Sequence, residues 1–146
     1  MQVLFSGLFR RLSYTADMNI AGFWTGKYVY EMSGMPAVKF YADIEQDGAL
    51  ISGTITERNT FDLHAGDILT AALDGHLSGN IVSFEKTYLN SVAQYAIMYS
   101  GSVSKDANLI TGKWDIGEWN GNFEMKRATE QQKISILRKT RIKEKV

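Results

Sequence analysis

The sequence predicts an all-β protein, a single eight-stranded antiparallel up-and-down β-barrel followed by a short C-terminal helix. Three observations predict this fold. Apolar residues alternate with polar residues along eight short segments, which is the period of a half-buried strand. Short turns rich in glycine, aspartate and asparagine separate most of these segments. No helix-length segment lies between them, so neighbouring strands are expected to run antiparallel.

The expected strands cover residues 22–31, 37–46, 49–58, 68–77, 81–88, 92–103, 109–116 and 119–127. The second strand has the clearest alternation, with Val38, Phe40, Ala42 and Ile44 on one face and mostly charged residues on the other. Asp47-Gly48 then supplies a tight hairpin turn. Eight strands are enough to close a barrel whose interior is filled by side chains or holds one small ligand.

Three regions follow from this pattern. Residues 1–20 are expected to be an N-terminal extension, in which residues 1–17 form a short helix or a disordered segment, and Met18 is an alternative translation start. Residues 21–127 form the barrel domain. Residues 128–146 are expected to form a helix or a basic tail, and Thr129 has the position and side chain of a helix N-cap.

Composition excludes several classes of function. The chain has no cysteine, which rules out disulfides, thiolate metal sites and cysteine nucleophiles. Its formal net charge of zero divides unevenly, because residues 21–127 carry 8 Lys/Arg and 13 Asp/Glu, a net −5, while residues 128–146 carry 6 and 2, a net +4. No segment approaches the length of a membrane span. We expect a cytoplasmic protein that contacts neither membrane nor nucleic acid.

Gly22-Phe23-Trp24 near the start and Arg127 at the end of the last strand resemble the calycins, the superfamily of lipocalins, fatty-acid-binding proteins and avidins. The resemblance covers about residues 21–127. It implies that Trp24 lies across one end of the barrel and that Arg127 stacks on it, as structural residues. The later pattern, including Ile110-x-Gly112-x-Trp114 and Phe123-x-Met125-x-Arg127, also looks like a group of small uncharacterised bacterial barrel proteins.

Glu57 and Lys86 are the polar residues of greatest interest. Strand alternation directs both side chains inward, where an unpaired charge is costly. One interpretation makes them a ligand-recognition pair, or makes Glu57 a general base. The alternative is that alternation slips near the strand ends, so that both side chains reach solvent at the rim of the barrel.

Aromatic residues on the same inward face are candidates for a binding pocket, because they combine apolar walls with hydroxyl groups. With Glu57 and Lys86, the predicted ligand-binding residues are Tyr28, Tyr30, Phe40, Tyr88, Tyr99 and Trp114. Tyr95 is a further tyrosine of this kind. The alternative for each of them is an ordinary place in the barrel core.

The chain offers weak signals for other chemistry. Asp62, His64 and Asp67 share one polar segment, but a solvated loop explains them better than a metal site does. We expect no metal and no cofactor. The basic residues of the C-terminal segment include Arg138 and Lys139, and a solvated helix face is favoured over nucleic-acid or lipid binding.

The leading hypothesis is therefore a calycin-like barrel that binds a small, partly apolar ligand. An enzyme of isomerase or cyclase type, using a buried carboxylate, is the first alternative. The second is an interaction module with a filled barrel, whose outer face or tail meets its partners. The sequence leaves the oligomeric state open, a homo-oligomer included.

Overall fold

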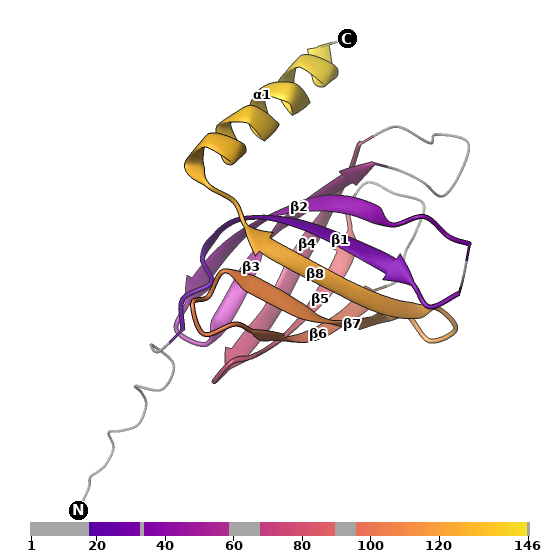
Figure 1. Ribbon diagram of the computed structural model, residues 1–146, viewed down its shortest axis with the longest axis vertical. Helices are drawn as coiled ribbons and strands as arrows, with labels where there is room; N and C mark the ends of the chain where they lie inside the picture. Colours follow the sequence, from indigo (N-terminus) through magenta and orange to yellow (C-terminus); the bar gives the residue numbers. More distant parts are fainter. Residues whose placement is uncertain (1–17, 33, 59–67, 90–95, 146) are drawn as a thin grey trace, which may run out of the picture.

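The computed structural model of the chain describes residues 18–32, 34–58, 68–89 and 96–145. Eight strands form one closed barrel in chain order, and each strand pairs antiparallel with the next, with β8 returning to β1 (Figure 1). The strands are β1 (Gly22–Tyr30), β2 (Val38–Asp47), β3 (Leu50–Arg58), β4 (Ile68–Ser78), β5 (Ile81–Tyr88), β6 (Ala96–Val103), β7 (Leu109–Asp115) and β8 (Asn120–Arg127). The predicted barrel is confirmed. Residues 92–95 of the expected sixth strand lie outside the described residues.

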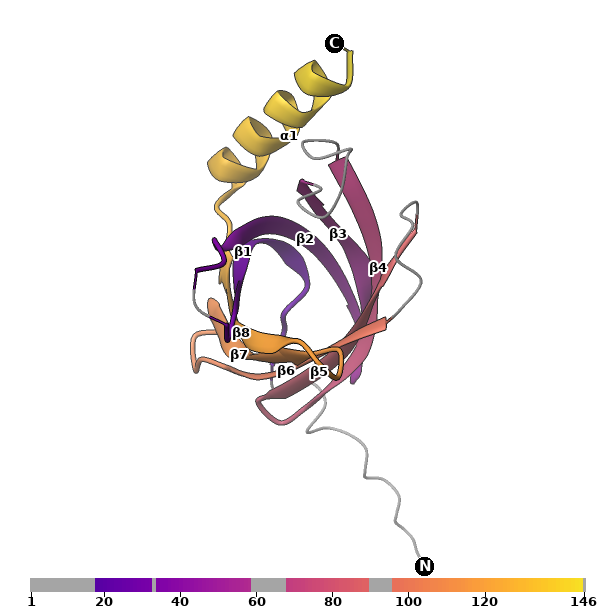
Figure 2. The ribbon, with the colours of Figure 1, turned by 90° about the vertical axis from the view of Figure 1, so that its right-hand side faces the viewer.

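The two ends of the barrel differ in how their strands are joined. At one end, which we call the turn end, Gly48 and Gly79 begin two-residue turns with positive φ angles of 62° and 60°. At the other, which we call the loop end, longer connections follow β1, β3 and β5. Figure 2 shows the strands curving around the interior. Long connections carry binding residues more often than tight turns do.

Alternation along the strands places the core inside the barrel, as predicted. In β2 the residues Val38, Phe40, Ala42 and Ile44 are all buried, while Lys39 and Asp43 are exposed. The same pattern continues around the barrel and produces one cluster of buried apolar side chains. Phe84, Tyr99 and Phe123 pack against one another within that cluster.

The turn end is closed by the predicted contact between Trp24 and Arg127. The Arg127 guanidinium lies 4.7 Å from the centroid of the Trp24 ring. Arg127 also donates hydrogen bonds to the carbonyl oxygens of Ala21 and Ala107, at 2.6 Å from Nη1 and 2.9 Å from Nη2. The Trp24 indole N–H donates to the Ile20 carbonyl at 3.0 Å. Arg127 therefore joins the entry to β1, the β6–β7 turn and the end of β8.

Arg127→Met should lower the free energy of unfolding by about 3 kcal/mol, because it removes a cation–π contact and several charge-assisted hydrogen bonds. Urea denaturation followed by tryptophan fluorescence would measure this loss. Lys126→Met is the matched control, since the exposed Lys126 makes one long ion pair of 3.9 Å with Glu124 and should change stability by under about 0.5 kcal/mol. Equal stability of the two variants would contradict the proposed closing role.

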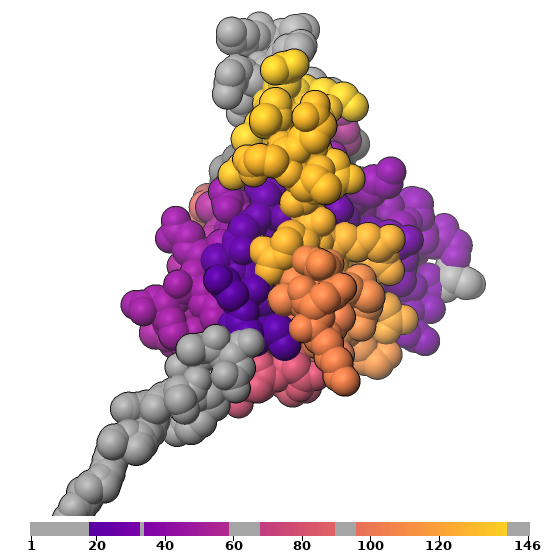
Figure 3. All heavy atoms as spheres, turned by 60° about the vertical axis from the view of Figure 1, so that its left-hand side comes forward, coloured from indigo at the N-terminus to yellow at the C-terminus, as the bar shows by residue number. Residues whose placement is uncertain are grey.

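The C-terminal helix α1 (Glu130–Lys145) begins with reciprocal capping. The Gln132 N–H donates to Thr129 Oγ1 at 3.0 Å, and the Thr129 N–H donates to Gln132 Oε1 at 2.8 Å. Thr129 is thus the predicted N-cap, in the arrangement of a capping box. The helix extends away from the barrel (Figures 1 and 3). It is too short and too polar to cross a membrane.

Candidate functional site

Glu57 on β3 and Lys86 on β5 meet inside the barrel, near its loop end. Both strands flank β4, where Glu57 pairs with Leu69 and Lys86 pairs with Leu73. Their side chains point inward because they occupy the same alternate positions as the apolar core residues around them. Glu57 is 3% exposed and Lys86 is 0% exposed. The inward direction is confirmed, and the alternative in which both reach solvent is wrong.

The Glu57 carboxylate accepts hydrogen bonds from three side chains. Lys86 Nζ donates to Oε1 at 2.5 Å and forms a buried ion pair. The Tyr28 and Tyr88 hydroxyls donate to Oε2 at 3.0 Å and 2.7 Å. These four residues come from β1, β3 and β5, so the closed barrel is what brings them together. We call them the buried polar cluster.

Aromatic rings surround the Lys86 ammonium on its remaining sides. Its Nζ lies 4.8 Å from the ring centroid of Tyr28, 4.7 Å from that of Tyr88 and 5.9 Å from that of Tyr99. The electron-rich face of an aromatic ring attracts a cation, particularly where water is excluded. One carboxylate and three rings together replace the water that Lys86 loses on burial.

Burial changes the proton affinity of Lys86 and of the tyrosines around it. It lowers the pKa of the Lys86 ammonium from its usual value, an effect that the Glu57 charge partly offsets. It raises the pKa of the Tyr28 and Tyr88 hydroxyls far above the usual value, and the negative charge of Glu57 adds to the rise. The pKa of Tyr99 is raised by the same two causes. The tyrosines therefore remain proton donors at neutral pH.

These tyrosine pKa values imply that stability declines above about pH 10. An unfolded chain releases tyrosine protons near its ordinary pKa of 10.0, whereas the folded protein retains those of Tyr28, Tyr88 and Tyr99. The folded state then binds more protons, so rising pH favours unfolding. The lowered pKa of Lys86 makes stability rise with pH up to its unfolded pKa of 10.5. The effect of this single lysine is smaller than the combined effect of the three tyrosines.

Ultraviolet titration of tyrosinate would test this expectation. At a pH of about 11.5, three fewer tyrosines should ionise in the folded protein than in the protein unfolded in urea. Simultaneous ionisation of all 7 tyrosines in the folded protein would contradict the burial of the three hydroxyls.

Tyr30 and Trp114 border the cluster on its loop-end side. Tyr30 and Trp114 contact each other edge to face, with centroids 5.0 Å apart, and Tyr28 contacts Trp114 at 5.6 Å. The Trp114 indole N–H donates to the Val29 carbonyl at 2.9 Å, which orients the ring. Trp119, 38% exposed, packs on Tyr30 at 5.7 Å. Trp119 was not among the predicted site residues, although its alternation with Gly121 along the expected last strand indicates an inward side chain.

Phe40 and Tyr99 occupy deeper positions. The ring of Phe40 lies 6.2 Å from that of Tyr28, and Tyr99 stacks on Phe84 at 4.7 Å. Phe40 is the cross-strand partner of Glu57, and Tyr99 lies beside the Lys86 ammonium, so both rings border the polar cluster from the apolar core. The predicted residues thus separate into a hydrogen-bonded centre, an aromatic border formed by Tyr30 and Trp114, and a floor formed by Phe40 and Tyr99.

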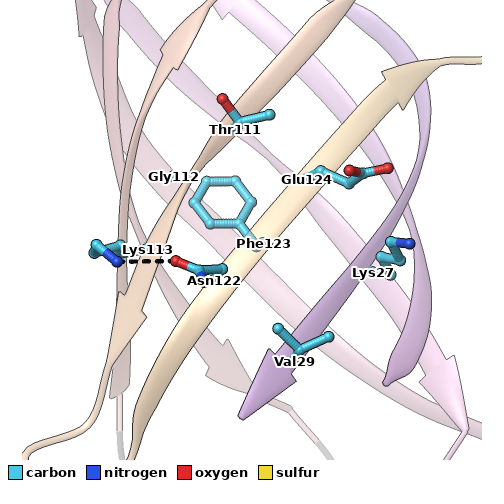
Figure 4. A pocket seen from close by; sticks show the side chains of 8 residues that line it. All are labelled: Lys27, Val29, Thr111, Gly112, Lys113, Asn122, Phe123 and Glu124. Atoms are coloured by element: carbon cyan, nitrogen blue, oxygen red, sulfur yellow. Dashed lines mark hydrogen bonds between the residues drawn. The ribbon is translucent and has the colours of Figure 1, made fainter. Parts of the chain in front are cut away.

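Two grooves on the outer surface lie apart from this cluster. One, of about 420 Å³, crosses β1, β7 and β8 and is lined by Lys27, Lys113 and Glu124 among others (Figure 4). Lys113 donates to Asn122 across it at 2.9 Å. The other, of about 490 Å³, crosses β2, β3 and β4 beside Leu50. Both grooves are bordered by charged, outward-facing residues, unlike the interior.

The described residues contain no group of three or more His, Asp or Glu side chains that could hold a metal ion. Asp62, His64 and Asp67 lie outside the described residues, and so does Tyr95.

Fold and site together define a closed eight-stranded antiparallel barrel with a buried ion pair and a C-terminal helix, an architecture consistent with a calycin-like fold. The chain matches no model of a known protein family, and no curated protein matches its sequence.

Proposed function

We propose that the protein is a calycin-like barrel that binds a small, partly apolar ligand at its loop end, above the buried polar cluster. The observation that carries the proposal is the Glu57 carboxylate, which is buried and accepts hydrogen bonds from Lys86, Tyr28 and Tyr88. Glu57 and Lys86 are the charged residues of the described interior, and both lie toward the same end.

A gain in stability does not by itself explain why the barrel contains such a cluster. Desolvation of two charges offsets most of their attraction, and apolar residues of similar volume often give an equally stable or more stable core. The rest of the described interior is packed with apolar side chains. A polar group placed where long connections meet the barrel is what ligand recognition requires, because a few fixed polar groups orient a ligand within apolar walls.

The cluster also indicates the chemistry of the ligand. The Tyr28 and Tyr88 hydroxyls donate to Glu57, so the polar part of a ligand would meet hydroxyl groups whose orientation is already fixed. The half-buried ring of Tyr30 and the 38% exposed ring of Trp119, whose centroids lie 5.7 Å apart, offer apolar surface at the same end of the barrel. The ligand we propose has a ring-like apolar body and at least one polar group.

Native mass spectrometry of the protein purified from its host tests the proposal by detecting a bound small molecule. The identified molecule would then be titrated against tryptophan fluorescence. The variants Tyr28→Phe and Tyr88→Phe should each weaken binding by about tenfold, since each removes one hydroxyl of the polar cluster on which the ligand lies. Tyr41→Phe is the matched control, because Tyr41 lies on the outer face, stacked against Phe23. A protein without a bound molecule, or equal affinity of all three variants, would contradict the proposal.

Glu57→Gln separates a binder from the enzyme alternative. The amide preserves the shape of the carboxylate, so a binding protein should retain most of its affinity. A general base would lose its turnover of the identified molecule while still binding it.

A further inference from the structure

We propose that the protein self-associates, with helix α1 of one copy docked on the acidic outer face of the barrel of a second copy. We define this acidic face as the outward side chains of Glu45, Asp47, Asp74 and Glu85, on strands β2, β4 and β5. The inference concerns the outside of the barrel and does not depend on the proposed ligand.

Strand register places the acidic residues in one row. Glu45 is the partner of Ser52, Ser52 of Asp74, and Asp74 of Glu85, so the row runs across four adjacent strands. Asp47 lies two residues beyond Glu45 on the same face of β2. All four carboxylates are exposed. The outward Lys39 and Arg58 on these strands lie at the loop end, away from the row.

Exposed apolar side chains accompany the carboxylates. Leu50 is 66% exposed, Ile81 is 49% exposed and Met98 is 49% exposed. Leu50 lies with Glu45, Asp47 and Asp74 in the groove of about 490 Å³. Leu50 therefore gives the acidic groove an apolar side chain that a docked partner would remove from water.

Helix α1 has the complementary composition. It carries six Lys/Arg, including the exposed Arg138 and Lys139, against two Glu. Ile134 and Leu137 on the helix are 45% and 42% exposed. A basic helix with partly exposed apolar side chains therefore matches an acidic face with exposed apolar side chains. Opposite charges of this kind set the orientation of two surfaces and speed their association.

Helix α1 is long enough for the groove that holds Glu45, Asp47 and Asp74. The 16 residues of α1 span about 24 Å at the rise of an α-helix. The strands β2 to β4 that line this groove span about 10 Å at the usual spacing between strands. Because the wall of the closed barrel curves away from a straight helix, the contact is confined to this side of the barrel.

A second copy is the occupant that the structure favours. In its own chain, α1 contacts the barrel beside Phe23 and Tyr41, through Lys133, Ile136 and Leu137, and then extends away from the barrel (Figure 3). Each chain thus presents one basic helix and one acidic face. A twofold dimer would use both contacts, because a symmetric pair repeats every interaction twice.

Sedimentation equilibrium of the full-length protein tests the proposal. We expect a dimer whose dissociation constant rises at least about tenfold between roughly 50 mM and 500 mM salt, because salt screens exposed charges. The pair Asp74→Lys/Glu85→Lys and the pair Arg138→Glu/Lys139→Glu should each weaken the dimer at least about tenfold. Circular dichroism would show that each variant is folded.

Combining both pairs of substitutions in one chain restores opposite charges and should return the dissociation constant to within about threefold of the original. Lys113→Glu is the control, because the exposed Lys113 lies on β7, in the groove of Figure 4 and away from strands β2 to β5, and it should leave the dimer unchanged. A protein that stays monomeric up to about 100 μM would overturn the proposal. So would a dimer that is insensitive to both charge reversals.

Discussion

Glu57→Ala is expected to lower the free energy of unfolding by about 3–5 kcal/mol. The substitution leaves the Lys86 ammonium, which is 0% exposed, without its counter-ion. It also removes the acceptor of the Tyr28 and Tyr88 hydroxyls, which then remain buried with a lost partner. A buried donor without an acceptor is costly because it has given up its bond with water.

The double variant Glu57→Leu/Lys86→Met should be more stable than Glu57→Ala by about 2 kcal/mol, because it leaves no uncompensated charge inside the barrel, while the Tyr28 and Tyr88 hydroxyls still lose their Glu57 acceptor. It removes both charges together and fills the space with apolar atoms. If the cluster exists for recognition, this variant should fold normally and fail to bind the ligand. Urea denaturation followed by circular dichroism measures the stabilities, and the fluorescence titration measures binding.

The control for both variants is the exposed ion pair between Glu124 and Lys126. Glu124→Ala should change stability by less than about 1 kcal/mol, as is usual for surface pairs. A small effect of Glu57→Ala, similar to that of Glu124→Ala, would show that water reaches the cluster. A double variant as unstable as Glu57→Ala would show instead that the charges themselves hold this end of the barrel together.

Gly121→Ala is expected to destabilise the protein by about 3 kcal/mol. A Cβ atom at this position would lie 1.8 Å from the Val29 carbonyl oxygen and 2.8 Å from Trp114 Nε1. Both contacts are too short for real atoms, and the first is with backbone, which cannot rotate away. The methyl group would therefore separate Trp114 from Val29, break their hydrogen bond of 2.9 Å and disturb the pairing of β1 with β8.

Asn122→Ala is the matched control, since Asn122 is the next residue of β8 and faces outward. It loses one exposed hydrogen bond from Lys113 and should change stability by less than about 0.5 kcal/mol. Denaturation curves give the difference, and near-ultraviolet circular dichroism should report the displaced Trp114 ring in Gly121→Ala alone. Equal stability of the two variants would mean that β1 and β8 can separate at little cost.

The barrel itself could be predicted from the sequence because its signals are local. Alternation in β2 needs only neighbouring residues, and the turns at Gly48 and Gly79 follow from residues that tolerate positive φ. The capping box at Thr129 is equally local. Trp24 and Arg127 are distant in the chain, and the resemblance to calycins is what suggested that they meet.

The sequence predicted which residues belong to the candidate site, but not how those residues contact one another. Alternation placed Glu57, Lys86, Tyr28 and Tyr88 on inward faces, each strand by itself. It did not show that one carboxylate accepts all three donors, because that depends on strand register across 29 to 31 residues of sequence. A shift of register by one residue would reverse every side chain. Trp119 was missed because its contact with Tyr30 is made between separate strand ends.

By itself, therefore, the sequence determined that this protein is an antiparallel barrel with a basic C-terminal segment, since periodicity, turns and charge are properties of short stretches. Only the tertiary structure decided which residues touch. Closure of eight strands at a particular register surrounds Lys86 with one carboxylate and three tyrosine rings. The same register aligns Glu45, Asp74 and Glu85 in a row on the outer face. Both features are relations between strands, and no single strand contains them.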